Sequence, residues 1–153
     1  MLFCVSAGFA DTDSEESDFW LCPSGEAALY SISGASYGGG FAFGYGKGSS
    51  IGMKVISFFN LDGMSVLELN FLLRFYFYGK RAYSGPFLQF IGGPALFFDN
   101  ESGFYVPSKI GVFSIGMSFG WRFLIKDRWF IEPCIRGGYP YLAGAGLSAG
   151  IRF

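Results

Sequence analysis

The sequence lacks histidine altogether. Histidine is the commonest metal ligand in proteins and the usual base that activates a catalytic nucleophile. The three cysteines form no C-x-x-C pair, so a zinc or haem site would lack its usual ligands. Asp99 and Glu101 are close in sequence, but two carboxylates on one loop are most simply a solvated pair. We therefore predict that the protein is not an enzyme and holds no metal or cofactor.

Long apolar runs are also missing, because no stretch reaches the roughly 18 consecutive apolar residues that mark a transmembrane helix. Charged residues make up 15% of the chain, against roughly 25% in soluble domains. No phosphate-binding loop and no basic stripe occurs, so we expect no nucleic-acid partner. By contrast, aromatic residues reach 21%, with 20 Phe and 24 Gly. This composition is typical of a membrane protein, yet the chain shows no helical periodicity.

The N-terminal part differs from the rest of the chain. Residues 1–10 (MLFCVSAGFA) indicate the end of a secretory signal peptide, with an ordinary flexible N-terminus as the alternative. An acidic run follows and predicts a flexible, solvated segment over residues 11–24. The folded domain is then expected over residues 25–153. Cys22 would precede the first strand and Cys134 would lie within a strand, and the sequence leaves open whether they are free or paired.

From residue 25 onward, apolar residues alternate with small or polar ones between turn signals. A period of two places the apolar side chains on one face of a β-sheet. We expect eight strands over residues 25–33, 37–46, 50–60, 64–78, 85–98, 109–125, 128–139 and 142–153. An even number of strands with short links and no crossover helix predicts an antiparallel up-and-down meander.

The C-terminal strand shows the alternation most clearly. Its apolar face carries Leu147, Ile151 and Phe153, whereas its other face carries glycine, Ser148 and Arg152. The strands at 64–78, 109–125 and 128–139 repeat this pattern, and each mid-strand charge lies on their small, polar face. Open strand edges promote aggregation, and closing the sheet into a barrel pairs every edge. We therefore predict a closed barrel.

The two faces of these strands decide which side of the barrel points inward. An eight-stranded barrel has an interior only just wide enough for side chains to fill. Six or seven large apolar residues from each long strand would overfill it, and a surface of glycine and serine would solubilise it poorly. With the apolar face toward lipid, both problems disappear, and the strands are long enough to span a bilayer. The sequence therefore predicts a membrane-spanning barrel.

On these residues the chain resembles the small eight-stranded outer-membrane barrels, the family typified by the OmpA transmembrane domain, OmpX and OmpW. The resemblance is carried by the run WRFLIKDRWFIEP, with aromatics on both sides of a tight turn, and by the ending GLSAGIRF. It implies an all-β fold, an eight-stranded antiparallel up-and-down transmembrane β-barrel in the bacterial cell outer membrane. Outer-membrane lipid is then the surrounding partner. Phe153 resembles the signal that such proteins present to the outer-membrane insertion machinery.

The family also implies that both termini lie in the periplasm. The links at 47–49, 79–84 and 126–127 would then be periplasmic, while those near 34–36, 61–63, 99–108 and 140–141 would face outward. Trp121 and Trp129 lie near one end of the expected barrel, and Tyr139 and Tyr141 lie near the other. These four residues would form aromatic belts at the two membrane interfaces.

The predicted lumen collects the charged residues of the small, polar face. They are Glu26, Lys54, Glu68, Arg74, Arg122, Glu132, Arg136 and Arg152. Buried charges need partners, so we predict that they form a network of ion pairs that fills a narrow barrel. A gated polar path, or an anion site lined by the surplus of arginine, is the functional alternative.

Two functions are compatible with such a barrel. The first is a structural or surface-interaction role for an outer-membrane protein whose lumen is plugged by salt bridges. The second, implied by the OmpW resemblance, is a narrow conduit or binding site for a small hydrophobic molecule, which would then be a ligand. A lumen occluded by ion pairs favours the first function, and a continuous cavity favours the second.

Overall fold

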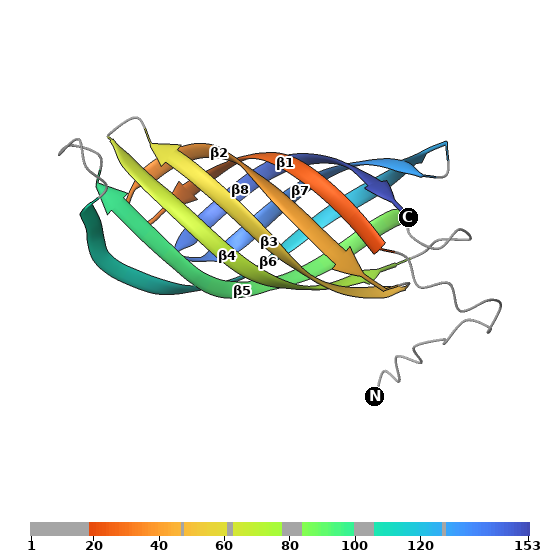
Figure 1. The fold of residues 1–153 in the computed structure, drawn as a ribbon, viewed down its shortest axis with the longest axis horizontal. Helices are drawn as coiled ribbons and strands as arrows, with labels where there is room; N and C mark the ends of the chain where they lie inside the picture. Colours follow the sequence, from red (N-terminus) through yellow and green to blue (C-terminus); the bar gives the residue numbers. More distant parts are fainter. Residues whose placement is uncertain (1–18, 47, 61–62, 78–83, 100–105, 127) are drawn as a thin grey trace, which may run out of the picture.

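The structure is a computed structural model, and it describes residues 19–46, 48–60, 63–77, 84–99, 106–126 and 128–153. The side chains of Asp99 and of residues 106–110 are outside this description. The described residues form a closed barrel of eight antiparallel strands in chain order (Figure 1). The predicted all-β, eight-stranded antiparallel barrel is therefore confirmed. The predicted signal remnant at residues 1–10 lies outside the described residues.

Each strand pairs with the next one along the chain, and the first pairs with the last. The strands are β1 (Phe19–Tyr30), β2 (Gly34–Tyr45), β3 (Ser49–Asn60), β4 (Met64–Tyr76), β5 (Gly85–Asp99), β6 (Val106–Ile125), β7 (Trp129–Tyr139) and β8 (Tyr141–Arg152). The β1–β8 pairing, with Trp20 opposite Arg152 and Gly25 opposite Leu147, closes the sheet. Both edges of every strand are thereby paired, which satisfies the backbone N–H and C=O groups without solvent.

The prediction for the first strand was wrong at both ends. We expected a strand at 25–33, but β1 spans Phe19–Tyr30 and residues 31–33 form the turn to β2. The barrel therefore begins inside the segment 11–24 that was predicted to be flexible, and Cys22 lies within β1. The alternation already starts at Trp20 and Cys22, whose side chains are buried. Pro23 pairs with Phe41 of β2 with its side chain directed outward. The other strand ends agree with the expected ones to within three residues.

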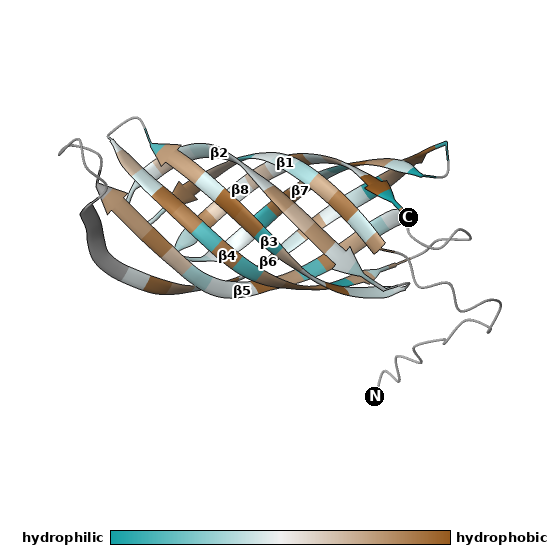
Figure 2. Ribbon diagram, in the orientation of Figure 1, coloured by the Kyte–Doolittle hydropathy of each residue, from teal (hydrophilic) through white to brown (hydrophobic). Residues whose placement is uncertain are grey.

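The faces of the strands are oriented as the alternation predicted. Along β4, Leu69, Phe71 and Leu73 are exposed on the outside, whereas Glu68 and Arg74 are buried inside. Figure 2 shows this alternation as brown and pale or teal bands along the strands. The apolar side chains thus cover the outer surface of the barrel, and the small, polar face lines the lumen.

The two ends of the barrel are distinguished by the chain itself. β1 begins and β8 ends at one end, the terminal end, on the right in Figure 1. The opposite end is the far end. β2 ends and β3 begins at the terminal end, as do β4 and β5, and β6 and β7. The turn at 31–33 and Pro140 lie at the far end, where β3 ends and β4 begins and where β5 ends and β6 begins. The outward link expected at 34–36 is therefore displaced, because Gly34 already belongs to β2.

Aromatic side chains pack against one another inside the lumen near each end. At the far end, the ring of Tyr30 meets those of Phe58, Phe97 and Tyr141 edge-on, at centroid distances of 5.3, 6.0 and 6.1 Å. We call these four residues the far aromatic cluster. Tyr141 was expected in an outer aromatic belt, but it is 0% exposed, so that prediction is wrong.

Tyr141 is directed inward because the pairing of β1 with β8 is irregular at this position. Leu29 is opposite Ala143 but Tyr30 is opposite Tyr141, so one extra residue on β8 is left between them. Such a bulge reverses the inward and outward alternation beyond it. The other expected belt residues, Trp121, Trp129 and Tyr139, are directed outward.

Candidate functional site

The interior charges form the most distinctive site of the molecule. Seven of the eight predicted lumen residues are no more than 9% exposed, namely Glu26, Lys54, Glu68, Arg74, Arg122, Glu132 and Arg136. Arg152 is only half-buried near the terminal end, where its backbone N–H donates to the carbonyl of Arg128 at 2.8 Å. The seven buried residues divide into two clusters along the barrel axis.

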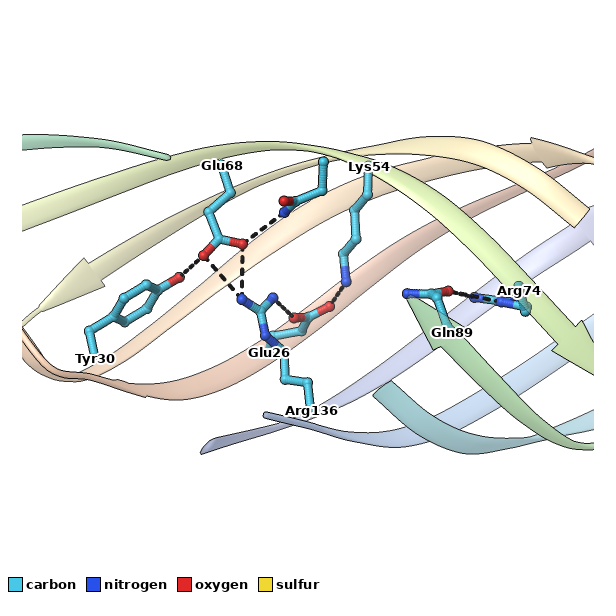
Figure 3. Close-up of polar contacts among 8 residues, drawn as sticks. Glu26, Tyr30, Lys54, Glu68, Arg74, Gln89 and Arg136 are labelled. Atoms are coloured by element: carbon cyan, nitrogen blue, oxygen red, sulfur yellow. Dashed lines mark hydrogen bonds and ion pairs between the residues drawn. The ribbon is translucent and has the colours of Figure 1, made fainter. Parts of the chain in front are cut away.

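The central ion-pair cluster consists of Glu26, Lys54, Glu68 and Arg136 (Figure 3). Arg136 lies between the two carboxylates and donates to both. Its Nη1 is 3.0 Å from Glu26 Oε2, and its Nη2 is 2.9 Å from Glu68 Oε2. Lys54 Nζ donates to the other oxygen of Glu26. Because these residues come from β1, β3, β4 and β7, the ion pairs cross the lumen and connect strands that are not neighbours in the sheet.

Neutral polar side chains also donate hydrogen bonds to the Glu68 carboxylate. The hydroxyl of Tyr30 donates to Glu68 Oε1 at 2.6 Å, and Asn70 Nδ2 donates to Oε2 at 2.9 Å. Ser114 on β6 then donates to the amide oxygen of Asn70 at 2.7 Å. On the far side, the guanidinium of Arg136 stacks on the Tyr141 ring at 3.6 Å. The far aromatic cluster and the central ion-pair cluster are thus one packed unit.

The terminal ion-pair cluster consists of Arg74, Arg122 and Glu132. Glu132 Oε1 accepts from Arg74 Nη1 at 2.7 Å and from Nε of Arg122. Arg74 also donates to the Gln89 amide oxygen through Nε at 2.9 Å and through Nη2 at 2.6 Å. The Glu132 carboxylate therefore accepts from both arginines, and the Gln89 amide oxygen is a second acceptor for Arg74.

Aromatic rings surround the terminal ion-pair cluster. The guanidinium of Arg122 lies 3.8 Å from the centroid of the Phe130 ring, and that of Arg74 lies 4.3 Å from the centroid of Phe87. Trp20 is within cation–π range of both arginines, at 5.3 Å from Arg122 and 4.7 Å from Arg74. We call Trp20, Tyr76, Phe87 and Phe130 the terminal aromatic cluster. The faces of these rings thus contact the two guanidinium groups near the terminal end of the lumen.

Glycines on the inner face make room for these rings. A Cβ atom at Gly150 would lie 2.6 Å from Cε2 of Phe130, and one at Gly120 would lie 2.6 Å from Cζ of Phe87. At Gly44 it would lie 2.6 Å from Cε2 of Trp20. Inner-face glycine is therefore needed because the eight-stranded lumen is narrow and its aromatic side chains cross it.

A small cavity separates the two ion-pair clusters. Its volume is about 20 Å³, which is room for about one water-sized sphere. It is lined by Cys22, Ser24, Ala42, Lys54, Leu72, Arg74, Phe87, Gln89, Ser118, Glu132, Cys134, Arg136 and Ser148. Cys22 and Cys134 are free thiols on this wall. No group of three or more His, Cys, Asp or Glu side chains within the described ranges is placed to hold a metal ion.

Sequence reasoning missed several participants in this site. Tyr30 and Tyr141 were not assigned to the lumen, since tyrosine fits either face of a barrel strand. Asn70 and Ser114 alternate in phase with the charged residues of β4 and β6, so their position on the inner face was a usable signal. Gln89 had no such signal, because β5 has no described charged side chain. Phe153, expected as an insertion signal, is exposed, and its backbone N–H donates to the carbonyl of Phe19 at 2.9 Å.

Comparison with known proteins identifies structural neighbours only. No protein-family model matches the chain, and no curated protein sequence matches it. No helix in the part of the chain that the structure describes is long and apolar enough to cross a membrane.

Three solved structures share the arrangement of the strands. Neisserial surface protein A has a TM-score of 0.66 and 14% identity, over 89% of this chain and 95% of that chain. The N-terminal β-barrel domain of Pseudomonas aeruginosa OprF has a TM-score of 0.56 and 15% identity, over 89% and 97%. Ail, the attachment invasion locus protein of Yersinia pestis, has a TM-score of 0.52 and 12% identity, over 90% and 97%.

Proposed function

We propose that this chain, which has the fold of small eight-stranded outer-membrane barrels, is an integral protein of the bacterial outer membrane with a structural or surface-interaction role. Its lumen serves as the polar core that holds the barrel closed. The observation that carries this proposal is the distribution of charge between the two faces of the wall.

The outer face of the strands carries no charged side chain among the described residues. Among the described side chains, the exposed charged ones are those of Lys126 and Arg128, which lie in the link between β6 and β7 and not on a strand. Along β6, by contrast, every second residue from Phe113 to Ile125 is a large apolar side chain that is 44–66% exposed. An arginine or lysine at the bilayer midplane costs about 2–4 kcal/mol. A surface of this kind fits hydrocarbon and would solubilise a protein poorly in water.

The lumen supports a closed core better than a conduit. A path for a hydrophobic molecule would need a continuous apolar channel, whereas the cavity between the clusters is about 20 Å³ and lined by four charged side chains. Aromatic clusters lie on both sides of it. This small, charged cavity does not favour the OmpW-like alternative.

The names of two structural neighbours support the surface part of the proposal. One is a surface protein and the other an attachment protein, and both names describe those proteins. In the present chain, the far end would face outward if both termini are periplasmic. A surface interaction would then use the far-end links.

Reconstitution of the full chain into lipid vesicles tests the proposal. We expect the refolded protein to float with the vesicles and to resist alkaline extraction. In planar bilayers it should produce no stepwise ion current, while an open porin in the same bilayer serves as the positive control. A chain that stays monomeric in water without detergent would overturn the membrane assignment. Stepwise currents from the folded protein would overturn the closed lumen.

A further inference from the structure

A groove crosses the outer wall of the barrel near the terminal end. Its volume is about 610 Å³, and ligand sites in proteins usually measure roughly 300–1,000 Å³. The groove extends over the four neighbouring strands β1, β2, β3 and β4 (Figure 1). It lies on the face that the proposed function places in lipid.

The register of the strands accounts for the shape of the groove. Its outward side chains form two rows that run across the strands. In the row nearer the terminal end, each residue is directly opposite the next, and the members are Phe19, Tyr45, Ile51 and Leu73. The other row lies two residues further along the strands and consists of Phe43, Met53 and Phe71. Between the rows, Gly44 and Gly52 are opposite each other, so the floor there is main chain.

The dimensions of the groove fit a single hydrocarbon chain. Neighbouring strands are about 4.8 Å apart, so a row across four strands is about 14 Å long, and two residues along a strand separate the rows by about 7 Å. An α-helix with its side chains is about 10–12 Å across and is too wide for this space. The hydrocarbon of one bilayer leaflet is about 15 Å thick, half of the full core. The groove therefore matches one lipid acyl chain in length and width.

The chemistry of the groove also fits the acyl chain of an amphiphile. Among the described residues that line it, none is charged, and Tyr45 carries the one polar side chain. Tyr45 ends β2 at the terminal end and is 52% exposed, and tyrosine favours the interface between lipid and water. Met53 has an unbranched side chain that adapts to irregular apolar partners. On the β1 side, the rings of Phe19 and Phe43 contact each other at a centroid distance of 6.3 Å.

We propose that this groove binds one acyl chain of a phospholipid, with the headgroup beside Tyr45. The inference rests on the proposed function, because it requires the outer wall to lie in a bilayer. A charged or strongly polar ligand would lose its water there without gaining partners from the described lining. A second copy of the barrel would present a convex wall and leave part of the groove empty, without the contacts that a flexible chain makes.

Native mass spectrometry of the full chain tests the groove. The protein is refolded into vesicles of palmitoyl-oleoyl phosphatidylcholine, transferred to detergent micelles and washed free of unbound lipid. We expect most folded chains to retain one phospholipid molecule. Flotation with the vesicles is measured first. A chain that does not float overturns the proposed function and the groove with it, whereas floating chains that retain no phospholipid overturn the groove alone.

Variants separate the groove from general adhesion of lipid to the wall. Ile51→Trp and Leu73→Trp place a large ring over the groove from β3 and from β4. Either should lower the lipid-bound fraction about tenfold, because the acyl chain loses its contacts with the floor. Ile135→Trp is the matched control, since Ile135 lies outside the groove on β7 and is 63% exposed, as Ile51 is. Equal losses in all three variants would overturn the site.

A photoactivatable diazirine on the acyl chain gives the position of the bound lipid. Crosslinks to Met53 and Phe71 that exceed those to Ile135 support the groove, and crosslinks spread evenly over the outer wall overturn it. A lipid-free dimer that Ile51→Trp converts into a monomer would also overturn it, because a second copy would then occupy the groove.

Discussion

Glu68 is the residue on which the central ion-pair cluster converges. It is 0% exposed and accepts from Arg136, from Tyr30 and from Asn70. A carboxylate at this depth is stable only because donors surround it. Removing it also leaves the Arg136 guanidinium with one acceptor fewer, which is the costly part of breaking a buried ion pair.

Substitutions at Glu68 and Tyr30 should therefore differ in size. Glu68→Ala is expected to lower the free energy of unfolding by about 3–5 kcal/mol. Tyr30→Phe removes only one hydroxyl and should cost about 1–2 kcal/mol. Urea titration of the refolded barrel, followed by tryptophan fluorescence, measures both. If Glu68→Ala costs no more than Tyr30→Phe, the network does not hold the barrel closed.

The sequence predicts that a side chain points into the lumen where the position of a charged residue and the alternation along the strand agree. Glu68 and Arg74 sit in an unbroken alternation, so their inward facing followed from the sequence. Tyr141 did not, because the extra residue opposite Leu29 and Tyr30 reverses the phase at the start of β8. The partners within each cluster were also beyond the sequence, since contacts across the lumen depend on how the tilted strands are staggered.

At the scale of the strand, glycine on the inner face decides how closely aromatic rings can pack against the wall. Gly150 of β8 faces the Phe130 ring of β7, its neighbour in the sheet. Gly25 of β1 faces outward, and a Cβ there would meet nothing within 4 Å. The same substitution at these two positions therefore has different consequences.

Gly150→Ala should destabilise the barrel by about 1–3 kcal/mol, because the added methyl group would clash with the Phe130 ring and with the backbone carbonyl oxygen of Leu21. Gly25→Ala is the matched control and should be neutral or slightly stabilising, since alanine restricts the unfolded chain. The urea midpoints of the two variants provide the comparison. Equal midpoints would mean that the terminal end of the lumen is loosely packed.

Strand boundaries were predictable except at β1. Along β4 and β6 the contrast between Phe or Leu and glycine or charge fixed both the strand and its faces. In β1 the contrast between faces is low, and Pro23 lies between the inward Cys22 and Ser24. A proline in a closed sheet is tolerated at a position where one ladder bond is absent, and β1 shows no pairing to β8 at that residue.

For the whole molecule, the medium in contact with the outer wall decides whether the barrel spans a membrane. Closure into eight paired strands follows from the structure, and the apolar outer face follows from the alternation. The membrane assignment additionally requires that this outer face contacts the hydrocarbon of a lipid bilayer. The three tryptophans are placed to test it, because Trp121 and Trp129 face outward and Trp20 is 1% exposed inside.

Quenching by brominated lipids measures this contact directly. Two single-tryptophan variants are refolded into vesicles whose lipids carry bromine on the acyl chains near the headgroup. Trp20→Phe with Trp129→Phe leaves Trp121, and Trp121→Phe with Trp129→Phe leaves Trp20. We expect strong quenching of Trp121 and little quenching of Trp20. Equal quenching of both, or stronger quenching of Trp20, would contradict a barrel whose apolar wall faces lipid.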